Sequence, residues 1–332
     1  MKFTDIIGQP VLVDSLKRAV MEDKAANGYI FYGPEGCGKK LTAFVFALAL
    51  NCRSQDGEIP CERCSSCIKF NTGNHPNIKV VKPTGASIKI KQIRDVINEV
   101  SKTSFESGFK IIIIDKAEKM THEAQDAFLK TLEEPPVNTV FMLLVENHHS
   151  LLQTVVSRCQ VFPLKRVKHN DIEDFLRRSF NIDDAKVKLA TAYSNGIIGR
   201  AVQILRNDSY FSRRENYIKT IMMLFEGTFV GLSNTLTELV STREEAVAFL
   251  DFMLGWFRDV MVLLEAPEAA EDMVINIDKL KELTYSAEAL TEKKLNSILN
   301  IITNTEKQLK HNVSIKNCMD VMILNIMEVN NG

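Results

Sequence analysis

The chain has 332 residues, of which 45% are hydrophobic and 25% charged, a composition typical of a soluble protein with two or three domains. Its formal net charge of −1 excludes a general attraction to nucleic acid, so any DNA contact must be local or shared with partners. The start lacks the apolar core of a secretion signal, and the apolar runs Phe44–Leu50 and Phe141–Val145 are too short to span a bilayer. We therefore expect a cytoplasmic protein with no membrane partner.

The N-terminal part begins with a predicted helix, strand, glycine-rich loop and helix. Apolar spacing predicts an amphipathic helix over Asp14–Asn27, and the apolar run Tyr29–Tyr32 predicts a strand. Residues 33–40 then read Gly-Pro-Glu-Gly-Cys-Gly-Lys-Lys, and an apolar helix is predicted over Leu41–Asn51. A strand, a glycine-rich loop and a helix in this order are the setting of a phosphate-binding P-loop.

This loop fits the P-loop pattern G-x-x-x-x-G-K-[S/T] at every position except the last. Its small residues let backbone N–H groups surround phosphates; they are Gly33, Gly36, Cys37 and Gly38. Lys39 is expected to attract phosphate, helped by the N-terminus of the following helix. Lys40 replaces the hydroxyl residue that binds Mg²⁺, and an ammonium group cannot bind a metal ion. We expect weak binding of ATP or ADP, with little dependence on magnesium.

Four of the seven cysteines lie close together in the sequence. They have the spacing C-x8-C-x2-C-x2-C and are Cys52, Cys61, Cys64 and Cys67. Disulfides are not expected in a reducing compartment, whereas four such thiolates are typical of a tetrahedral Zn²⁺ site. Four thiolates leave no open coordination position, so the predicted zinc is structural. The alternative is four unrelated buried thiols.

Three further strands and two helices follow. The predicted strands are Ile78–Lys82, Lys110–Asp115 and Thr139–Val145, and the helices are Ile90–Lys102 and Thr121–Glu133. The isoleucine run within Lys110–Asp115 indicates burial on both faces of a parallel sheet. Alternating strands and helices predict a doubly wound α/β domain over residues 1–164.

Asp115 ends its strand where P-loop ATPases carry the carboxylate that helps to position Mg²⁺. In the active form of that class the next residue is a glutamate that polarises the attacking water, but here it is Lys116. Glu118 is expected to lie in the wrong place to replace it unless the loop bends unusually. Lys40 and Lys116 both argue against efficient hydrolysis.

The remainder of the chain is predicted to be helical. His169–Phe180, Asp183–Ser194 and Ile198–Arg206 predict a small three-helix domain over residues 165–207, and Asn207-Asp208-Ser209 reads as a linker. Residues 208–332 predict an all-helical domain. Its apolar stripes lie in Tyr217–Leu224, Ala246–Leu264 and Leu295–Ile302.

Several segments together resemble the bacterial clamp-loader subunits of DNA polymerase III, which belong to the AAA+ ATPase class. The matching strings are FTDIIGQ at 3–9, GYIFYGPEGCGKK at 28–40, the four-cysteine cluster, KIIIIDKAEKMTHEAQDAFLKTLEEPP at 110–136, SRC at 157–159, GIIGRA at 196–201 and LKHNVSIKNCMDVMIL at 309–324. The similarity is dense over residues 3–205 and thin over 210–332. It implies a P-loop AAA+ domain with the zinc module at 52–67, a helical lid at 165–207 and a helical collar at 208–332.

The resemblance also implies roles for three residues outside the P-loop. Arg158 of the SRC motif matches an arginine finger that acts on the neighbouring subunit's ATP. Arg200 matches the sensor 2 arginine that reaches the nucleotide phosphates. Asn147 is the nearest match to the sensor 1 polar residue, while His148 and His149 are interpreted as loop residues.

Within the family, the two lysines favour the delta-prime stator over the ATP-hydrolysing gamma/tau motor, which remains the alternative. A third hypothesis is a nucleotide-independent scaffold. The implied partners are gamma/tau and delta subunits, the sliding clamp, and primer–template DNA reached through the complex.

Overall fold

The computed structural model describes residues 1–54, 59–100, 108–309 and 313–331. It divides into two compact units, Met1–Gln203 and Ile204–Gly332. Parts of three predicted segments lie outside the described residues: positions 55–58 of the zinc module, 101–102 of the helix Ile90–Lys102, and 310–312 of the late segment that matches the family.

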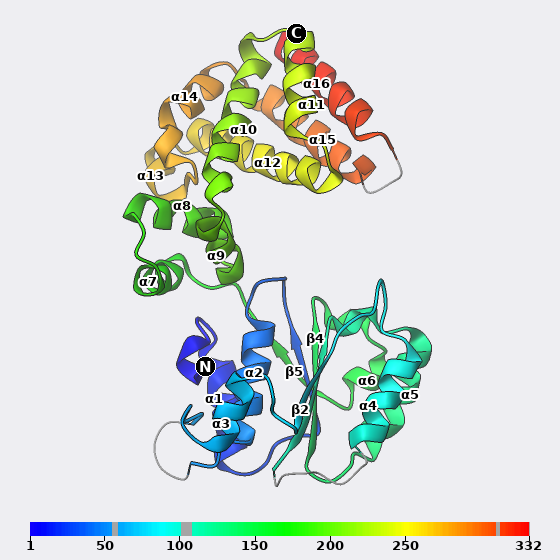
Figure 1. The fold of residues 1–332 in the computed structure, drawn as a ribbon. Helices are drawn as coiled ribbons and strands as arrows, with labels where there is room; N and C mark the ends of the chain where they lie inside the picture. The colour runs from blue at the N-terminus through cyan, green and yellow to red at the C-terminus, as the bar shows by residue number, and fades with distance from the viewer. Residues whose placement is uncertain (55–58, 101–107, 310–312, 332) are drawn as a thin grey trace. The chain divides into compact units, whose positions relative to one another are not determined.

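The first unit is built on a five-stranded parallel sheet with the strand order β2-β3-β4-β1-β5 (Figure 1). The strands are β1 (Gly28–Tyr32), β2 (Ile78–Val81), β3 (Lys110–Asp115), β4 (Thr139–Val145) and β5 (Gln160–Pro163). The sequence did not predict β5. This strand has four residues at the sheet edge, and none of them is buried, so it lacks the apolar run that marks the central strands.

Helices cover both faces of this sheet, as the doubly wound prediction requires (Figure 1). One layer holds α1 (Pro10–Met21), α2 (Lys39–Leu50) and α3 (Ser65–Asn71), and the other holds α4 (Ile90–Val100), α5 (His122–Glu133) and α6 (Gln153–Val156). A hydrophobic core lies on each face of the sheet, and alternate residues of β1 point into one or the other. Phe31 packs with α1 and α2, whereas Ile30 packs with α4 to α6. Helix α1 begins earlier than predicted, since Pro10 suits the first helical position.

Three helices follow the sheet: α7 (His169–Ser179), α8 (Asp184–Ser194) and α9 (Ile198–Arg206). The bounds agree with the predicted helices to within one residue at each end. All of α7 and α8 and most of α9 belong to the same compact unit as the sheet. The start of α9 can therefore be placed relative to the P-loop.

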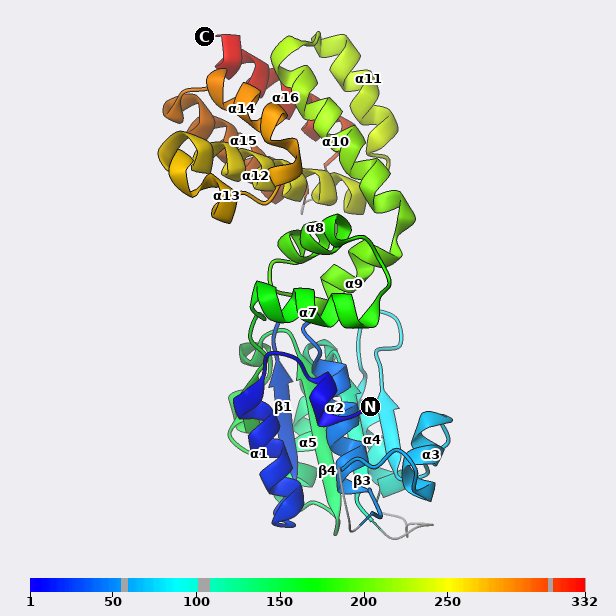
Figure 2. The same ribbon diagram turned by 90° about the vertical axis from the view of Figure 1, so that its left-hand side faces the viewer.

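The second unit is all-helical, as predicted. Its helices are α10 (Asp208–Glu226), α11 (Phe229–Leu239), α12 (Arg243–Glu265), α13 (Ala270–Met273), α14 (Leu280–Glu288), α15 (Glu292–Leu309) and α16 (Ile315–Asn331). Helix α12 packs against α14 and α15, and α15 also packs against α16 (Figure 2). Within the described residues, no helix combines the length and the apolar character needed to cross a membrane.

The predicted linker Asn207-Asp208-Ser209 is wrong. Asn207 caps α10, because its side-chain oxygen accepts a hydrogen bond from the Ser209 N–H at 3.1 Å. Asparagine, aspartate and serine are favoured both in loops and at helix starts, so this cluster alone could not separate the two structures.

A buried polar network joins α10 and α12 to the segment before α14. The fully buried Asp259 carboxylate accepts hydrogen bonds from the backbone N–H groups of Ile275 and Asn276 and from the Asn276 amide. The Asn276 side-chain oxygen in turn accepts from Arg214, whose guanidinium forms two bonds to Asp278 at 2.6 and 2.8 Å. Because a buried charge is costly unless it is hydrogen-bonded, these contacts fix how the three segments meet.

Candidate functional site

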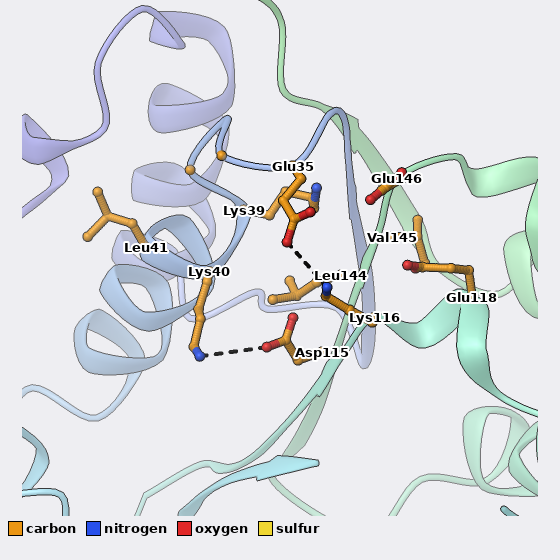
Figure 3. Close-up of a pocket in the computed structure, with 12 residues that line it drawn as sticks. Glu35, Lys39, Lys40, Leu41, Asp115, Lys116, Glu118, Leu144, Val145 and Glu146 are labelled. Carbon is orange, nitrogen blue, oxygen red and sulfur yellow. Dashed lines mark hydrogen bonds and ion pairs between the residues drawn. The ribbon is translucent and has the colours of Figure 1, made fainter. Parts of the chain in front are cut away.

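A pocket of about 390 Å³ lies where the P-loop meets the carboxyl ends of β3 and β4 (Figure 3). Ligand sites of parallel α/β sheets form at this edge. Five predicted nucleotide residues line the pocket: Gly36, Gly38, Lys39, Lys40 and Asp115. The other lining residues are Glu35, Leu41, Lys116, Glu118, Leu144, Val145 and Glu146. Gly33, Cys37, Asn147 and Arg200 are not among them.

The P-loop touches the start of α9 through backbone atoms. The Gly36 carbonyl accepts a hydrogen bond from the Gly199 N–H at 3.0 Å. A Cβ atom on Gly199 would lie 2.7 Å from that oxygen, so only glycine allows this approach. Arg200, the next residue, is exposed. The fold therefore carries Arg200 next to the loop, although its side chain does not line the pocket.

Lys39 is held by the loop itself. Its Nζ donates hydrogen bonds to the carbonyl oxygens of Gly33 at 2.5 Å and Pro34 at 3.0 Å. A phosphate group would have to compete with these two acceptors. Cys37 is buried in the same loop, and burial raises the pKa of its thiol. This cysteine therefore packs as a neutral side chain.

Lys40 forms an ion pair across the pocket. Its Nζ lies 3.6 Å from Asp115 Oδ2 (Figure 3). The same nitrogen lies 5.7 Å from the centre of the Phe44 ring. A P-loop ATPase would use the carboxylate at this strand end to help hold Mg²⁺. Here the ammonium group of Lys40 pairs with that carboxylate.

Lys116 forms a second ion pair, with Glu35 of the P-loop, at 3.2 Å (Figure 3). The hydrogen bond and charge of Glu35 raise the pKa of the Lys116 ammonium. This group therefore stays protonated at neutral pH and cannot serve as a general base. The two lysines that depart from the ATPase pattern, Lys40 and Lys116, thus each pair with a carboxylate of the pocket lining.

Glu118 lies closer to the site than the sequence led us to expect. The backbone at Lys116 is left-handed, with φ of 55°, and the short helix Ala117–Lys119 follows at once. This bend brings Glu118 into the pocket lining (Figure 3). Its Oε2 atom is buried and has no hydrogen-bond partner among the described residues. Sequence reasoning missed this because a left-handed lysine has no recognisable signature.

Asn147 is used locally in the structure. Its side chain is exposed at the start of the short helix His148–Ser150, where it accepts a hydrogen bond from the His149 N–H at 3.0 Å. The His148 ring packs against Tyr32, with 4.5 Å between ring centres. The two histidines belong to this turn, in agreement with their interpretation as loop residues.

The four predicted zinc ligands come together in the fold. The Sγ atoms of Cys52, Cys61, Cys64 and Cys67 all lie within 4.8 Å of one another. Cys52 follows α2, whereas Cys64 and Cys67 lie at the start of α3, so the cluster joins the two helices. Four sulfur atoms at this separation fit a tetrahedral zinc ion, for which Zn–S distances are about 2.3 Å.

The four thiols differ in pKa: hydrogen bonds lower the pKa of Cys61 and Cys64, whereas burial raises that of Cys52 and Cys67. The Cys64 N–H donates to Cys61 Sγ at 3.3 Å. Burial raises the pKa of Cys61, but hydrogen bonds from the Arg63 and Cys64 backbone and from neighbouring thiols outweigh it and lower the pKa to about 6. The fit to a structural Zn²⁺ rests on the four convergent sulfur atoms, and binding the metal would displace the protons of Cys52 and Cys67.

Arg158 lies on the surface just after α6, with 35% of its side chain exposed. The following Cys159 packs close to β1, since a Cβ atom on Gly28 would lie 2.7 Å from its sulfur. Burial raises the pKa of the Cys159 thiol to about 12, so it remains neutral and packs as a structural group. This packing anchors the base of Arg158 against the sheet.

Comparison with known proteins gives consistent matches. A family model described as "DNA polymerase III, delta subunit" matches residues 8–168. DNA polymerase III subunit delta' of Bacillus subtilis (strain 168) is 30% identical over 323 residues, covering 96% of each chain. Subunit tau of the same strain is 25% identical over 332 residues, covering 93% of this chain but only 58% of tau. A crystal structure of a DNA polymerase III gamma subunit-related protein from Thermotoga maritima has 18% identity and a TM-score of 0.46, covering 96% and 99% of the two chains.

The P-loop after β1, the acidic residue that ends β3 and the strand order together define an AAA+ domain. The similarity to subunit delta' extends over nearly the whole length of both chains. The chain belongs to the DNA polymerase III clamp-loader family.

Proposed function

We propose that the chain is a delta-prime stator, which completes a ring of clamp-loader subunits and lends Arg158 to the ATP site of its neighbour. In this proposal the motor and delta subunits are its partners, and the ring loads the sliding clamp onto primed DNA in the cytoplasm. Residues 1–164 serve as the AAA+ domain, 165–207 as the lid and 208–332 as the collar.

The two ion pairs inside the pocket are the observation that carries this proposal. Lys40 neutralises Asp115, and Lys116 pairs with Glu35. Hydrolysis of ATP needs a magnesium ion and a group that orients the attacking water. In this pocket Lys40 stands where P-loop ATPases have the hydroxyl residue that binds the metal. Lys116 stands where they have the glutamate that orients the water. The extensive similarity to subunit delta' supports the same proposal.

A gamma/tau-type motor is the second candidate, and Glu118 is the observation in its favour. Its Oε2 atom, which has no hydrogen-bond partner among the described residues, belongs to the pocket lining and could orient a water molecule in place of residue 116. The pairing of Lys40 with Asp115 argues against this candidate, because it leaves the magnesium position without its usual carboxylate.

We expect the purified chain to show no ATP turnover above background, yet to be required for turnover by the assembled loader. The measurement is phosphate release with primed DNA and clamp, from the chain alone and from complexes assembled with and without it. Turnover by the chain alone that disappears in Glu118→Gln would contradict the stator proposal and establish the motor.

We also propose that the pocket holds a nucleotide without magnesium, with Lys40 supplying the positive charge. ATP and ADP should bind weakly and with equal affinity in Mg²⁺ and in EDTA. In Lys40→Thr, binding in EDTA should weaken by about tenfold, as expected for a lost charged hydrogen bond of about 1.5 kcal/mol, and Mg²⁺ should restore it.

Titration of a fluorescent ATP analogue checks this prediction. Lys188→Thr is the control, because it makes the same change in α8, where Lys188 pairs with Asp184. Strictly magnesium-dependent binding by the unmodified chain would show that Lys40 does not replace the metal.

A further inference from the structure

The guanidinium of Arg158 is held in a defined position by groups of its own chain. Nη2 forms an ion pair with Glu133 Oε1 at 2.6 Å. Nη1 donates to the Thr154 carbonyl at 2.8 Å. An exposed arginine otherwise samples many rotamers, and fixing it costs conformational entropy. Here contacts on both terminal nitrogens reduce that freedom before any neighbour is present.

Glu133 lies where a carboxylate does not help its own helix. It is the last residue of α5, whose C-terminal end carries partial negative charge. A carboxylate at this end is disfavoured by the helix dipole unless a cation compensates it. Arg158 supplies a cation here by pairing directly with Glu133, in addition to Lys130 in the last turn of the helix.

The contacts leave part of the guanidinium available. Arginine has five N–H groups, and the bonds described above involve only the two terminal nitrogens. Within the described part of the chain, Nε–H has no hydrogen-bond partner. Glu133 can therefore hold one nitrogen of the fork while other N–H groups point to a phosphoryl group.

We propose that Glu133 is a positioning residue for Arg158: it orients the guanidinium for the ATP of the neighbouring subunit. This inference rests on the proposed arginine-finger function. Glu133 does not touch the nucleotide and acts only through Arg158.

The test uses the reconstituted clamp loader and measures kcat and KM for ATP at the neighbouring site. Glu133→Gln keeps the shape of the side chain but removes its charge. It should lower kcat by about three- to tenfold, in line with a charged hydrogen bond at a partly exposed position, and leave KM and complex assembly unchanged. Glu134→Gln is the matched control, because Glu134 is the adjacent exposed carboxylate.

Arg158→Ala separates this inference from the function on which it rests. Glu133→Gln added to Arg158→Ala should cause no further loss, because Glu133 has then lost its target. A further loss in the double variant, or equal losses in Glu133→Gln and Glu134→Gln, would overturn the positioning role. If Arg158→Ala lowers turnover and Glu133→Gln does not, only the positioning role fails. If Arg158→Ala has no effect, the arginine finger fails and the inference fails with it.

Discussion

Replacing Arg158 by alanine is expected to lower ATP turnover at the neighbouring subunit's site by a factor of about 10³–10⁵, the range known for arginine fingers. The guanidinium is always charged, and its planar fork matches the charge that develops on the transferred phosphoryl group. The measurement is single-turnover phosphate release by the complex bound to primed DNA.

Loss of folding should not account for this effect. Arg158 is one third exposed and its pair with Glu133 lies at the surface, so alanine should cost at most about 1 kcal/mol of stability. Arg178→Ala is a suitable control, because it removes an exposed arginine from α7. Arg158→Lys should recover only part of the rate, since an ammonium lacks the fork. A rate within threefold of the unmodified complex would show that Arg158 does not act on the neighbour.

Removing the metal, or replacing Cys61 by serine, is expected to unfold the zinc module locally. Binding energy in such sites contributes directly to folding, by about 10–16 kcal/mol in zinc-finger peptides. Cys64 and Cys67 belong to the start of α3, which has only seven residues and is too short to be stable by itself. Zinc content per chain and hydrogen exchange of Ser65–Asn71 measure the effect.

Cys159→Ser is the matched control, because Cys159 lies outside the cluster and packs near β1. It should keep one zinc ion per chain and full protection of α3. If Cys61→Ser retained both, the four cysteines would be ordinary packed thiols and the zinc assignment would be wrong.

The strength of local patterns explains which parts of the fold could be predicted. The strands β3 and β4 are apolar along most of their length, and their bounds match the predicted ones. The edge strand β5 was missed because its residues are only half buried or exposed. Polar clusters were ambiguous, so Asn207 was interpreted as part of a linker although it caps a helix.

The site was predictable in its residue types but not in its pairings. The P-loop pattern identified residues that line the pocket, and the cysteine spacing identified four thiols that the structure brings together. The pairs Lys40–Asp115, Lys116–Glu35 and Arg158–Glu133 join residues from different elements, so no local pattern reveals them. The bend at Lys116 that brings Glu118 to the pocket depends on the same tertiary contacts.

The two lysine pairs also bear on what single substitutions would do to this pocket. Replacing Lys116 alone by glutamate would remove the cation that pairs with Glu35. It would also add a fifth carboxylate to a pocket that already has four: Glu35, Asp115, Glu118 and Glu146. Replacing Lys40 alone by threonine would leave Asp115 without the cation that pairs with it, unless a metal ion were bound. Each single substitution is therefore electrostatically unfavourable. Positions 40 and 116 are coupled, because the charge of Asp115 acts on both lysines. If the proposed stator function is correct, the paired lysines make hydrolysis hard to gain by one substitution at a time.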